Sequence, residues 1–244
     1  MCARHTRTDS RQVDTSLAVE ESYDNLLEAL QGSQVFMNAK REKAVSRLYI
    51  IGVSATGKTT LIDDLAKHFA PHKQAQKLGI ITEVARELVK CSHLSSATIR
   101  SGDSDSMQLQ RMILWIQRVR EDAALKSKTL VLSDRSGIDP LVFAKYYGQD
   151  QSMFATMQKS EDWQTLRRRM QGASVVLCEP QKEWYREDGV RVELESSSEL
   201  FQLHQAFFDL LTEHEIPFVI LPRHMEGREA RVEFVLQNFE QKRY

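Results

Sequence analysis

The chain has 244 residues, of which 41% are hydrophobic, so it can bury the core of one or two ordinary domains. Its 33 Lys and Arg residues against 34 Asp and Glu residues give a net charge of −1, which excludes a strong overall attraction to nucleic acid or to an anionic membrane. Three scattered cysteines, Cys2, Cys91 and Cys178, form no Cys-x-x-Cys pair, which argues against a disulfide framework or a zinc site and favours a reducing compartment.

The first 46 residues are predicted to be a polar leader that precedes the fold. Met1–Ser16 contains no apolar stretch of the kind found in a secretory signal. Leu17–Leu30 has leucines at helical spacing and predicts one amphipathic helix. No run is apolar over the roughly 18 residues that a membrane span needs. We therefore expect a leader over residues 1–46 and a domain over residues 47–244, in a cytoplasmic protein with no integral membrane segment and no nucleic-acid partner.

A strand, a glycine-rich loop and a helix open the domain. The apolar run Leu48–Ile51 leads into Gly52-Val53-Ser54-Ala55-Thr56-Gly57-Lys58-Thr59-Thr60, which has the phosphate-binding pattern G-x-x-x-x-G-K-[ST]. The glycines allow successive N–H groups to point at one phosphate, and the helix that follows adds unpaired N–H groups and the positive end of its dipole. Lys58 is predicted to reach the β- and γ-phosphates of ATP, and Thr59 to bind Mg²⁺. The alternative is a chance glycine-rich turn, but the flanking strand and helix favour nucleotide binding.

The rest of the domain alternates apolar strands with amphipathic helices. Further strands are expected at Leu78–Thr82, Thr129–Ser133, Ser174–Cys178 and Pro217–Leu221. Further helices are expected at Glu83–Lys90, Met107–Lys126, Pro140–Tyr147, Glu161–Met170, Ser198–Glu213 and Glu226–Phe239. The Ser-rich stretch Cys91–Ser106 is predicted to be a mobile loop. This alternation indicates an α/β protein with the P-loop nucleoside triphosphate hydrolase fold: a five-stranded parallel sheet with helices on both faces, as in nucleoside and nucleotide kinases.

Polar side chains follow the predicted strands, where open α/β sheets bind their ligands. Asp134 follows the third strand as a Walker B acid does and is predicted to hold Mg²⁺ opposite Thr59, or to cap the next turn. Arg135 suits a bidentate contact to a phosphate, or a structural ion pair. Glu83 is the candidate base for an acceptor hydroxyl, or a helix cap. Arg86, one helical turn on, is predicted to contact the substrate.

Further charged residues follow the fourth strand, where Glu179 comes first. The charged loop that follows contains Arg186 and Arg191, which are suited to closing over phosphates and neutralising developing charge. A solvated loop is the alternative. The run Arg167–Arg169 is interpreted as a solvated helix face, with part of a lid as the alternative.

These motifs resemble the P-loop domain shared by NadR-type nicotinamide riboside kinases and the related TRPL-translocation-defect-like AAA-domain proteins. The matching segments are Gly52–Thr60, Thr82–Arg86, Leu132–Leu141 and Asp188–Arg191. The resemblance implies a nucleoside-kinase-like fold and transfer of the ATP γ-phosphate to a small acceptor, with Glu83 in the place of the base and Arg135 near the phosphates. No counterpart of the nucleotidyltransferase or DNA-binding region of bacterial NadR is recognised, so only kinase activity is implied.

Two functions remain open at this point. The favoured one is a small-molecule kinase that uses ATP and Mg²⁺, because the sequence places an acid and several arginines in the acceptor half of the expected cleft. The other is a nucleotide-dependent switch or slow NTPase that binds a protein or lipid partner. The segment Pro222–Met225 stands where a guanine-reading Asn/Thr-Lys-x-Asp motif would be expected, which favours adenine. The acceptor and the oligomeric state are not predicted.

Overall fold

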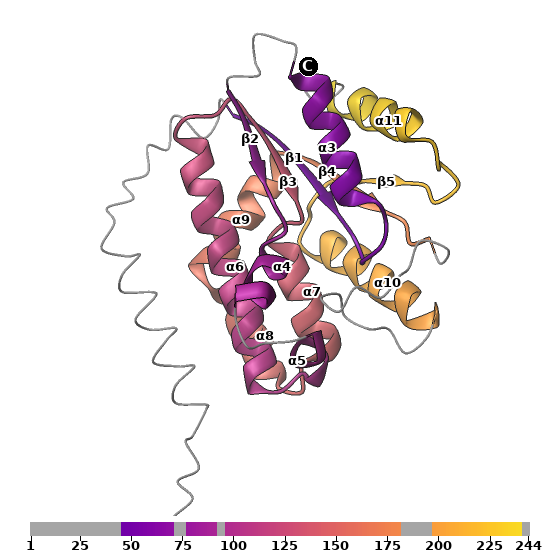
Figure 1. Cartoon of the computed structure of the whole chain (residues 1–244). Coiled ribbons are helices and arrows are strands. Elements are labelled where there is room, and N and C mark those ends of the chain that lie inside the picture. Colours follow the sequence, from indigo (N-terminus) through magenta and orange to yellow (C-terminus); the bar gives the residue numbers. More distant parts are fainter. Residues whose placement is uncertain (1–44, 71–76, 92–95, 182–196, 241–244) are drawn as a thin grey trace, which may run out of the picture. The chain divides into compact units, whose positions relative to one another are not determined.

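The computed structural model describes residues 45–70, 77–91, 96–181 and 197–240, which build one sheet and the helices around it (Figure 1). The strands are β1 (Ser46–Ile51), β2 (Leu78–Ile81), β3 (Leu130–Asp134), β4 (Ser174–Cys178) and β5 (Val219–Leu221). The helices are α3 (Lys58–Phe69), α4 (Val84–Cys91), α5 (Ser96–Ser101), α6 (Ser104–Leu125), α7 (Ile138–Tyr147), α8 (Gln151–Lys159), α9 (Glu161–Gln171), α10 (Ser197–Glu213) and α11 (Arg228–Glu240). The predicted leader helix Leu17–Leu30 lies outside the described residues.

The sheet is fully parallel and has the strand order β2-β3-β1-β4-β5. β1 is the central strand, and Leu48 is in register with Leu132 on one side and with Ser174 on the other. β2 and β3 lie on one side of β1, and β4 and β5 lie on the other. In such sheets the ligand binds at the carboxyl ends of the strands, at the point where the strand order reverses. The loop that follows β1 therefore occupies the expected ligand position, and the predicted fold class is confirmed.

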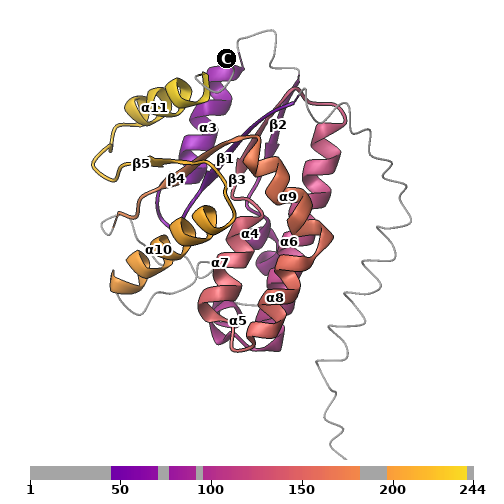
Figure 2. The same cartoon turned by 180° about the vertical axis from the view of Figure 1, so that it is seen from behind.

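The two faces of β1 bury different helices. Leu48 and Ile50 belong to the core cluster that includes α3 and α11, whereas Tyr49 and Ile51 belong to the cluster formed with α6 to α10. All four side chains are at most 1% exposed. Successive side chains of a strand point to opposite faces, so this near-continuous apolar run is what a sheet covered on both faces requires. Figures 1 and 2 show the two helical layers from opposite sides.

The prediction of a mobile loop over Cys91–Ser106 is wrong for its described part. Residues 96–101 form α5, Ile99 is buried, and α6 begins at Ser104. The Asp103 side chain accepts a hydrogen bond of 2.9 Å from the Ser106 backbone N–H, which caps α6. Serine and aspartate favour both loops and helix caps, and here they act as caps. The sequence analysis also missed α8, which begins after the capping residue Asp150.

The interpretation of Arg167–Arg169 as a solvated face is wrong for Arg169, which is 3% exposed. Its guanidinium lies 2.5 Å from an Asp122 carboxylate oxygen and 3.6 Å from Glu121 Oε2, while the Tyr49 hydroxyl donates to Glu121 over 3.0 Å. We call these four residues the helix-layer cluster. Burial, the larger influence, raises the pKa of Glu121 despite the nearby Arg169 charge, and burial also raises the pKa of Tyr49.

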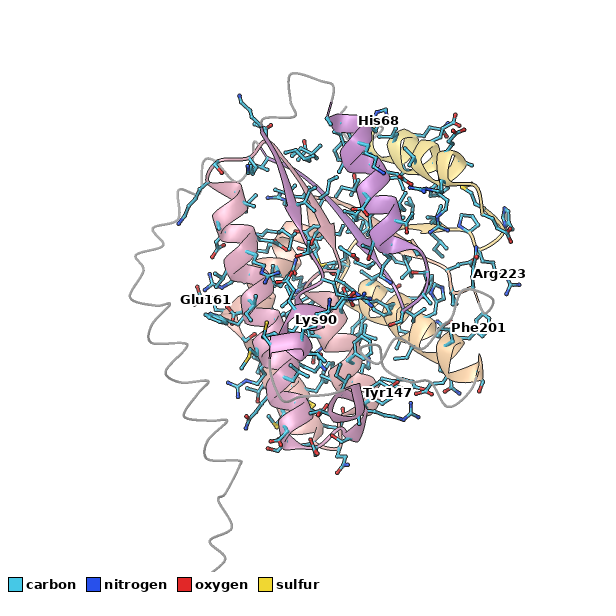
Figure 3. The ribbon with its side chains drawn as sticks, in the orientation of Figure 1. His68, Lys90, Tyr147, Glu161, Phe201 and Arg223 are labelled. Carbon is cyan, nitrogen blue, oxygen red and sulfur yellow. The ribbon has the colours of Figure 1, made fainter. Side chains whose placement is uncertain are left out.

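Glu199 near the start of α10 connects three helices. Its carboxylate accepts hydrogen bonds of 2.9 and 3.2 Å from Arg100 on α5 and one of 2.8 Å from the Tyr147 hydroxyl on α7. Figure 3 marks Tyr147 and, on α10, Phe201, whose side chain is one of the few large apolar groups that remain exposed. Within the described residues, no helix combines the length and the apolar character needed to cross a membrane.

Candidate functional site

The loop between β1 and α3 has a tightly curled backbone that depends on its glycines. Gly52 has a φ of 128°, and a Cβ atom there would lie 2.8 Å from the Cys178 carbonyl oxygen. Ala55 and Gly57 also have positive φ values, of 60° and 74°. Such turns direct successive backbone N–H groups into one concavity, which suits an anion. The first turn of α3 follows at once and adds its own N–H groups at the same place.

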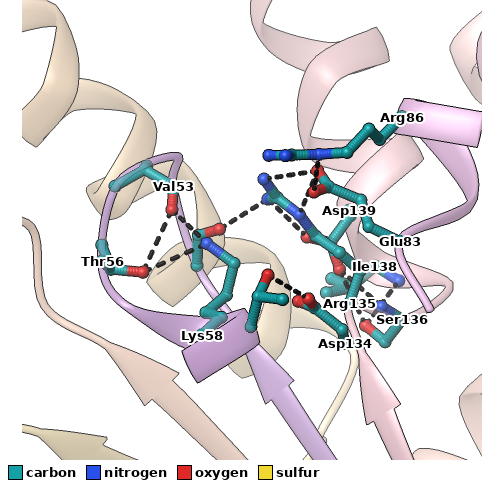
Figure 4. Close-up of polar contacts among 12 residues, drawn as sticks. Val53, Thr56, Lys58, Glu83, Arg86, Asp134, Arg135, Ser136, Ile138 and Asp139 are labelled. Carbon is teal, nitrogen blue, oxygen red and sulfur yellow. Dashed lines mark hydrogen bonds and ion pairs between the residues drawn. The ribbon is translucent and has the colours of Figure 1, made fainter. Parts of the chain in front are cut away.

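Lys58 is buried within this loop. Its ammonium group donates to the Val53 carbonyl and, over 3.1 Å, to the Thr56 hydroxyl (Figure 4). Burial, followed by the neighbouring Arg135 charge, lowers the pKa of Lys58 to about 8, against the opposing effect of Asp134 and other acids. Both of its partners are uncharged, so a buried cation at this position gains most from an added anion.

Thr59 and Asp134 join the start of α3 to the end of β3. The Thr59 hydroxyl donates to Asp134 Oδ2 over 2.6 Å, while Asp134 Oδ1 is buried and has no hydrogen-bond partner among the described residues. A buried carboxylate oxygen without a partner is costly and calls for an explanation. A hydroxyl and a carboxylate are also oxygen ligands that Mg²⁺ accepts when phosphate and water complete its shell. The pair therefore fits Mg²⁺, although no group of three His, Cys, Asp or Glu side chains suited to a metal occurs in the described part of the chain.

Arg135 is held in a strained backbone conformation at the centre of the site. Its φ is 84°, a value that is rare for a residue other than glycine. Its backbone N–H donates to the Ile50 carbonyl over 3.0 Å, and Nη1 donates to the Gly52 carbonyl over 2.6 Å and to Asp139 over 3.1 Å. Strain of this kind persists only where surrounding contacts fix it, and it concentrates at functional sites. The guanidinium is thereby fixed beside the loop.

Glu83, two residues after the end of β2, completes a charged group around Arg135. Its Oε1 accepts from Arg135 Nε over 3.0 Å and its Oε2 from Arg86 Nε over 3.2 Å (Figure 4). Burial opposes ionisation of this carboxyl, but the charges of Arg135, Lys58 and Arg86 outweigh it and lower its pKa to about 2. Asp139 belongs to the same group because it pairs with Arg135. We call Glu83, Arg86, Arg135 and Asp139 the site cluster.

Two pockets meet at the site cluster. The loop pocket is lined by residues 54–60, and the α6 pocket lies between α4, α6 and α7. Ser54, Glu83, Arg86 and Arg135 line both of them. One pocket is therefore lined by the phosphate-type loop and the other by apolar and polar side chains in nearly equal number, and charged groups stand at their junction.

A family model described as an AAA domain matches residues 47–229, which is most of the chain and includes the loop, the site cluster and α10. The chain belongs to this AAA-domain family. A search of curated proteins found no match.

Solved structures share the fold of this AAA-domain protein. NadR protein in complex with NR has 20% sequence identity and a TM-score of 0.64, over 96% of this chain and 60% of the NadR chain. The deoxyadenosine kinase from M. mycoides with products dCMP and dCDP has 14% identity and a TM-score of 0.56, over 80% of this chain and 98% of the kinase chain. Thymidylate kinase from Ehrlichia chaffeensis has 12% identity and a TM-score of 0.51, over 81% of this chain and 99% of the thymidylate kinase chain. The chain thus spans about 60% of the NadR length.

The remaining charged residues of this AAA-domain protein do not all lie at the site cluster. Glu179 is turned to the loop after β5, where its Oε2 accepts the Arg223 backbone N–H over 2.9 Å. Arg186 and Arg191 lie outside the described residues. Arg231 on α11, which the sequence analysis did not single out, is buried and donates to the Thr56 carbonyl over 2.7 Å. Arg231 is far from the phosphate-type loop in sequence, so no sequence pattern pointed to it. Its hydrogen bond to Thr56 helps to hold that loop in place.

Proposed function

We propose that the protein is a kinase that transfers the γ-phosphate of ATP to the hydroxyl of a small, nucleoside-like acceptor. The observation that carries the proposal is the position of the site cluster at the junction of the loop pocket and the α6 pocket. Phosphoryl transfer depends on positioning and electrostatic stabilisation, so it needs a phosphate site, an acceptor site and charged groups where the two meet. The site has candidates for all three.

On the nucleotide side, residues 52–60 would hold the phosphates through backbone N–H groups and through Lys58. Thr59 and Asp134 would hold Mg²⁺, which would explain the unpartnered Asp134 Oδ1. ATP with Mg²⁺ supplies the phosphoryl group to be transferred. The cost of burying the Lys58 ammonium, visible in its lowered pKa, would be offset when a triphosphate lies next to it.

On the acceptor side, Glu83 would orient the attacking hydroxyl and take its proton, and Arg86 would contact the acceptor. Glu83 is ionised at neutral pH, because its pKa is about 2. Such a carboxylate is a weak base, yet it still accepts a hydrogen bond from a hydroxyl, and in a loose transition state the proton leaves late. Arg135, fixed beside the loop, would stabilise charge on the transferred group. Arg186 and Arg191 would add to this from the segment after β4.

The solved structures that share the fold support the acceptor class. One of the NadR structures was solved with NAD and AMP-PNP, and the deoxyadenosine kinase structure with dCMP and dCDP. All of these relatives are under 25% identical to the chain. The likeness alone does not determine the acceptor, because one fold supports many activities.

A nucleotide-dependent switch is the second candidate, and one specific observation favours it. Both carboxylate oxygens of Glu83 are already engaged, Oε1 by Arg135 and Oε2 by Arg86. In a switch these ion pairs would be a stable state that nucleotide binding rearranges, with no acceptor hydroxyl ever reaching Glu83.

The deciding experiment is a phosphate-transfer screen with γ-labelled ATP and Mg²⁺ against nucleosides and vitamins, nicotinamide riboside included. Lys58→Ala serves as the background control. The proposal predicts a labelled product with the wild type that disappears with Lys58→Ala. Slow release of free phosphate without any labelled acceptor would instead support the switch.

The role of Glu83 has a sharper test. Glu83→Gln should abolish transfer while leaving ATP affinity nearly unchanged, because the amide keeps the shape of the side chain but cannot accept the proton. Glu87→Gln, four residues on and within α4, is the matched control, since Glu87 pairs with Arg120 and lines neither pocket. Unreduced transfer by Glu83→Gln would remove the base assignment.

A further inference from the structure

The part of α6 from Gln110 to Gln117 forms one wall of the α6 pocket. Gln117 stands level with the end of the sheet, because its amide donates to the Ser133 hydroxyl of β3 over 3.0 Å. Gln110 precedes it by seven residues, or about two helical turns, so both lie on one face of α6, about 10 Å apart along its axis. Figure 1 shows this part of α6 continuing past the ends of the strands, and both glutamines line the pocket.

The two amides differ in their hydrogen bonds. Gln117 Nε2 donates to Ser133 and to Glu121 Oε1, each over 3.0 Å, so both of its hydrogens are used. Gln110 is 1% exposed, and its Nε2 is buried without a hydrogen-bond partner among the described residues. Buried amides are almost always paired, so an unpaired donor that lines a pocket points to an acceptor group bound in that pocket.

The surroundings of Gln110 restrict what that group can be. Val89, Ile99, Ile113 and Phe143 line the same pocket and offer no side-chain hydrogen bonds. Phe143 also stacks on Tyr147 with ring centroids 6.1 Å apart, which fixes its orientation. A polyol would leave most of its hydroxyls unpaired against such walls, whereas a flat ring with one or two polar edge atoms would not.

We propose that Gln110 is a specificity-determining residue for the acceptor. Its amide N–H donates to a carbonyl oxygen or ring nitrogen at the edge of a flat ring, and the ring lies between the apolar walls. The hydroxyl end of the same molecule then points back toward the site cluster, about two turns of α6 away. The inference rests on the proposed function for its reaction, but it concerns binding and can be tested without phosphate transfer.

The test compares Gln110→Met with Gln108→Met in the full chain. Methionine keeps the length of glutamine and its helix preference but removes the donor. Gln108 is a matched control on the same helix, because its Oε1 is also buried without a partner in the described residues, yet it does not line the pocket. Calorimetric titration uses adenosine, cytidine, thymidine and nicotinamide riboside as probes, ribose as a probe without a base, and ATP as a reference.

At least one nucleoside should bind the wild type, and ribose at least about tenfold more weakly. Gln110→Met should weaken nucleoside binding about fivefold to tenfold, the effect of one lost neutral hydrogen bond. Gln108→Met should leave it unchanged, and ATP affinity should not move in either variant. Thermal stability of Gln110→Met should be equal or higher, because the Nε2 group has no partner to lose among the described residues. A residue with a merely structural role would lower it.

The outcomes separate this inference from the proposed kinase. Phosphate transfer to a nucleoside that is unaffected by Gln110→Met keeps the kinase and overturns the role of Gln110. Nucleoside binding that weakens with Gln110→Met but leads to no transfer keeps the role of Gln110 and overturns the kinase. Absence of nucleoside binding to the wild type, or equal weakening by both methionine variants, overturns the inference as well. Gln110→Glu, which replaces the donor by an acceptor, should shift preference from thymidine toward adenosine and cytidine, whose rings carry amino groups.

Discussion

The site cluster and the helix-layer cluster both combine arginine and carboxylate groups with shifted pKa values, yet only the first lines the loop pocket and the α6 pocket. The site cluster lies at the carboxyl edge of the sheet, contains the strained Arg135, and stands between the loop pocket and the α6 pocket. The helix-layer cluster joins α6 and α9 to the sheet, and its members line neither pocket. Burial and pKa shifts alone therefore do not identify a functional site. Position at the carboxyl edge of the sheet, backbone strain and the adjoining pockets make the distinction.

The largest effect is expected from Arg169→Met, which would break the helix-layer cluster. Removing Arg169 leaves the buried Glu121 carboxylate without this cation and Asp122 with only the partly exposed Arg118, and such losses cost about 3–5 kcal/mol. Urea unfolding should show this decrease in the free energy of unfolding. Phosphate transfer per folded molecule should stay near the wild-type value, since Arg169 lines neither pocket. If Arg169→Met were stable but inactive, the helix-layer cluster would have a functional role and would no longer contrast with the site cluster.

Lys58→Met should have the opposite effect to Arg169→Met: it should lower phosphate transfer and leave stability intact. Loss of one preorganised charge at a developing anion lowers kcat by about 100-fold to 1,000-fold, which corresponds to about 3–4 kcal/mol of barrier. Its stability should be unchanged or higher, because among the described residues the buried ammonium donates to two uncharged groups, the Val53 carbonyl and the Thr56 hydroxyl. Activity and urea unfolding of the same preparation check both statements. A large loss of stability in Lys58→Met would mean that the loop needs this cation in order to fold.

The fold and the nucleotide half of the site were predictable from the sequence. Apolar strands between helices predicted the parallel sheet, and the spacing of Gly52, Gly57 and Lys58 predicted the loop. The hydrophobic run before Asp134 placed that residue at the carboxyl edge, and the structure puts it within hydrogen-bond distance of Thr59. These features depend on local order along the chain, which is why a pattern reveals them.

The acceptor half was not predictable in the same way. The helical pattern of α6 indicates a buried face, but it does not tell that Gln110 meets a pocket while Gln117 is paired. The positive φ of Arg135 depends on contacts with segments distant in sequence. The arginine run 167–169 looks solvated because nothing in its spacing reveals Asp122 across the helix layer. Tertiary contacts determine all three, so only the structure shows them.

The pH dependence of stability should distinguish Glu83 from surface carboxylates. Its folded pKa of about 2 lies below the usual value near 4.5, so the stabilisation is complete above pH 4.5 and is lost as the pH falls toward 2. The shift corresponds to about 3 kcal/mol. Glu83→Gln should flatten the unfolding free energy between pH 4.5 and 2, whereas Glu229→Gln, at an exposed position on α11, should not. Parallel curves for the wild type and Glu83→Gln would show that the ion pairs of the site cluster contribute no such stability.

The smallest effect is expected for the ion pair between Lys145 and Glu213, which joins α7 to α10 over 3.0 Å. Its side chains are 39% and 49% exposed, so water already solvates both charges and salt screens them. Lys145→Ala should lower the free energy of unfolding by no more than about 0.5 kcal/mol, and less at 1 M salt. Like the pair of Arg169 and Asp122, this ion pair joins a cation to a carboxylate, but its side chains are much more exposed. Comparing the two pairs therefore measures how much burial contributes to the loss of stability. If urea unfolding gave Lys145→Ala and Arg169→Met similar losses, burial would not be the source of the large effect, and the helix-layer cluster would need another explanation.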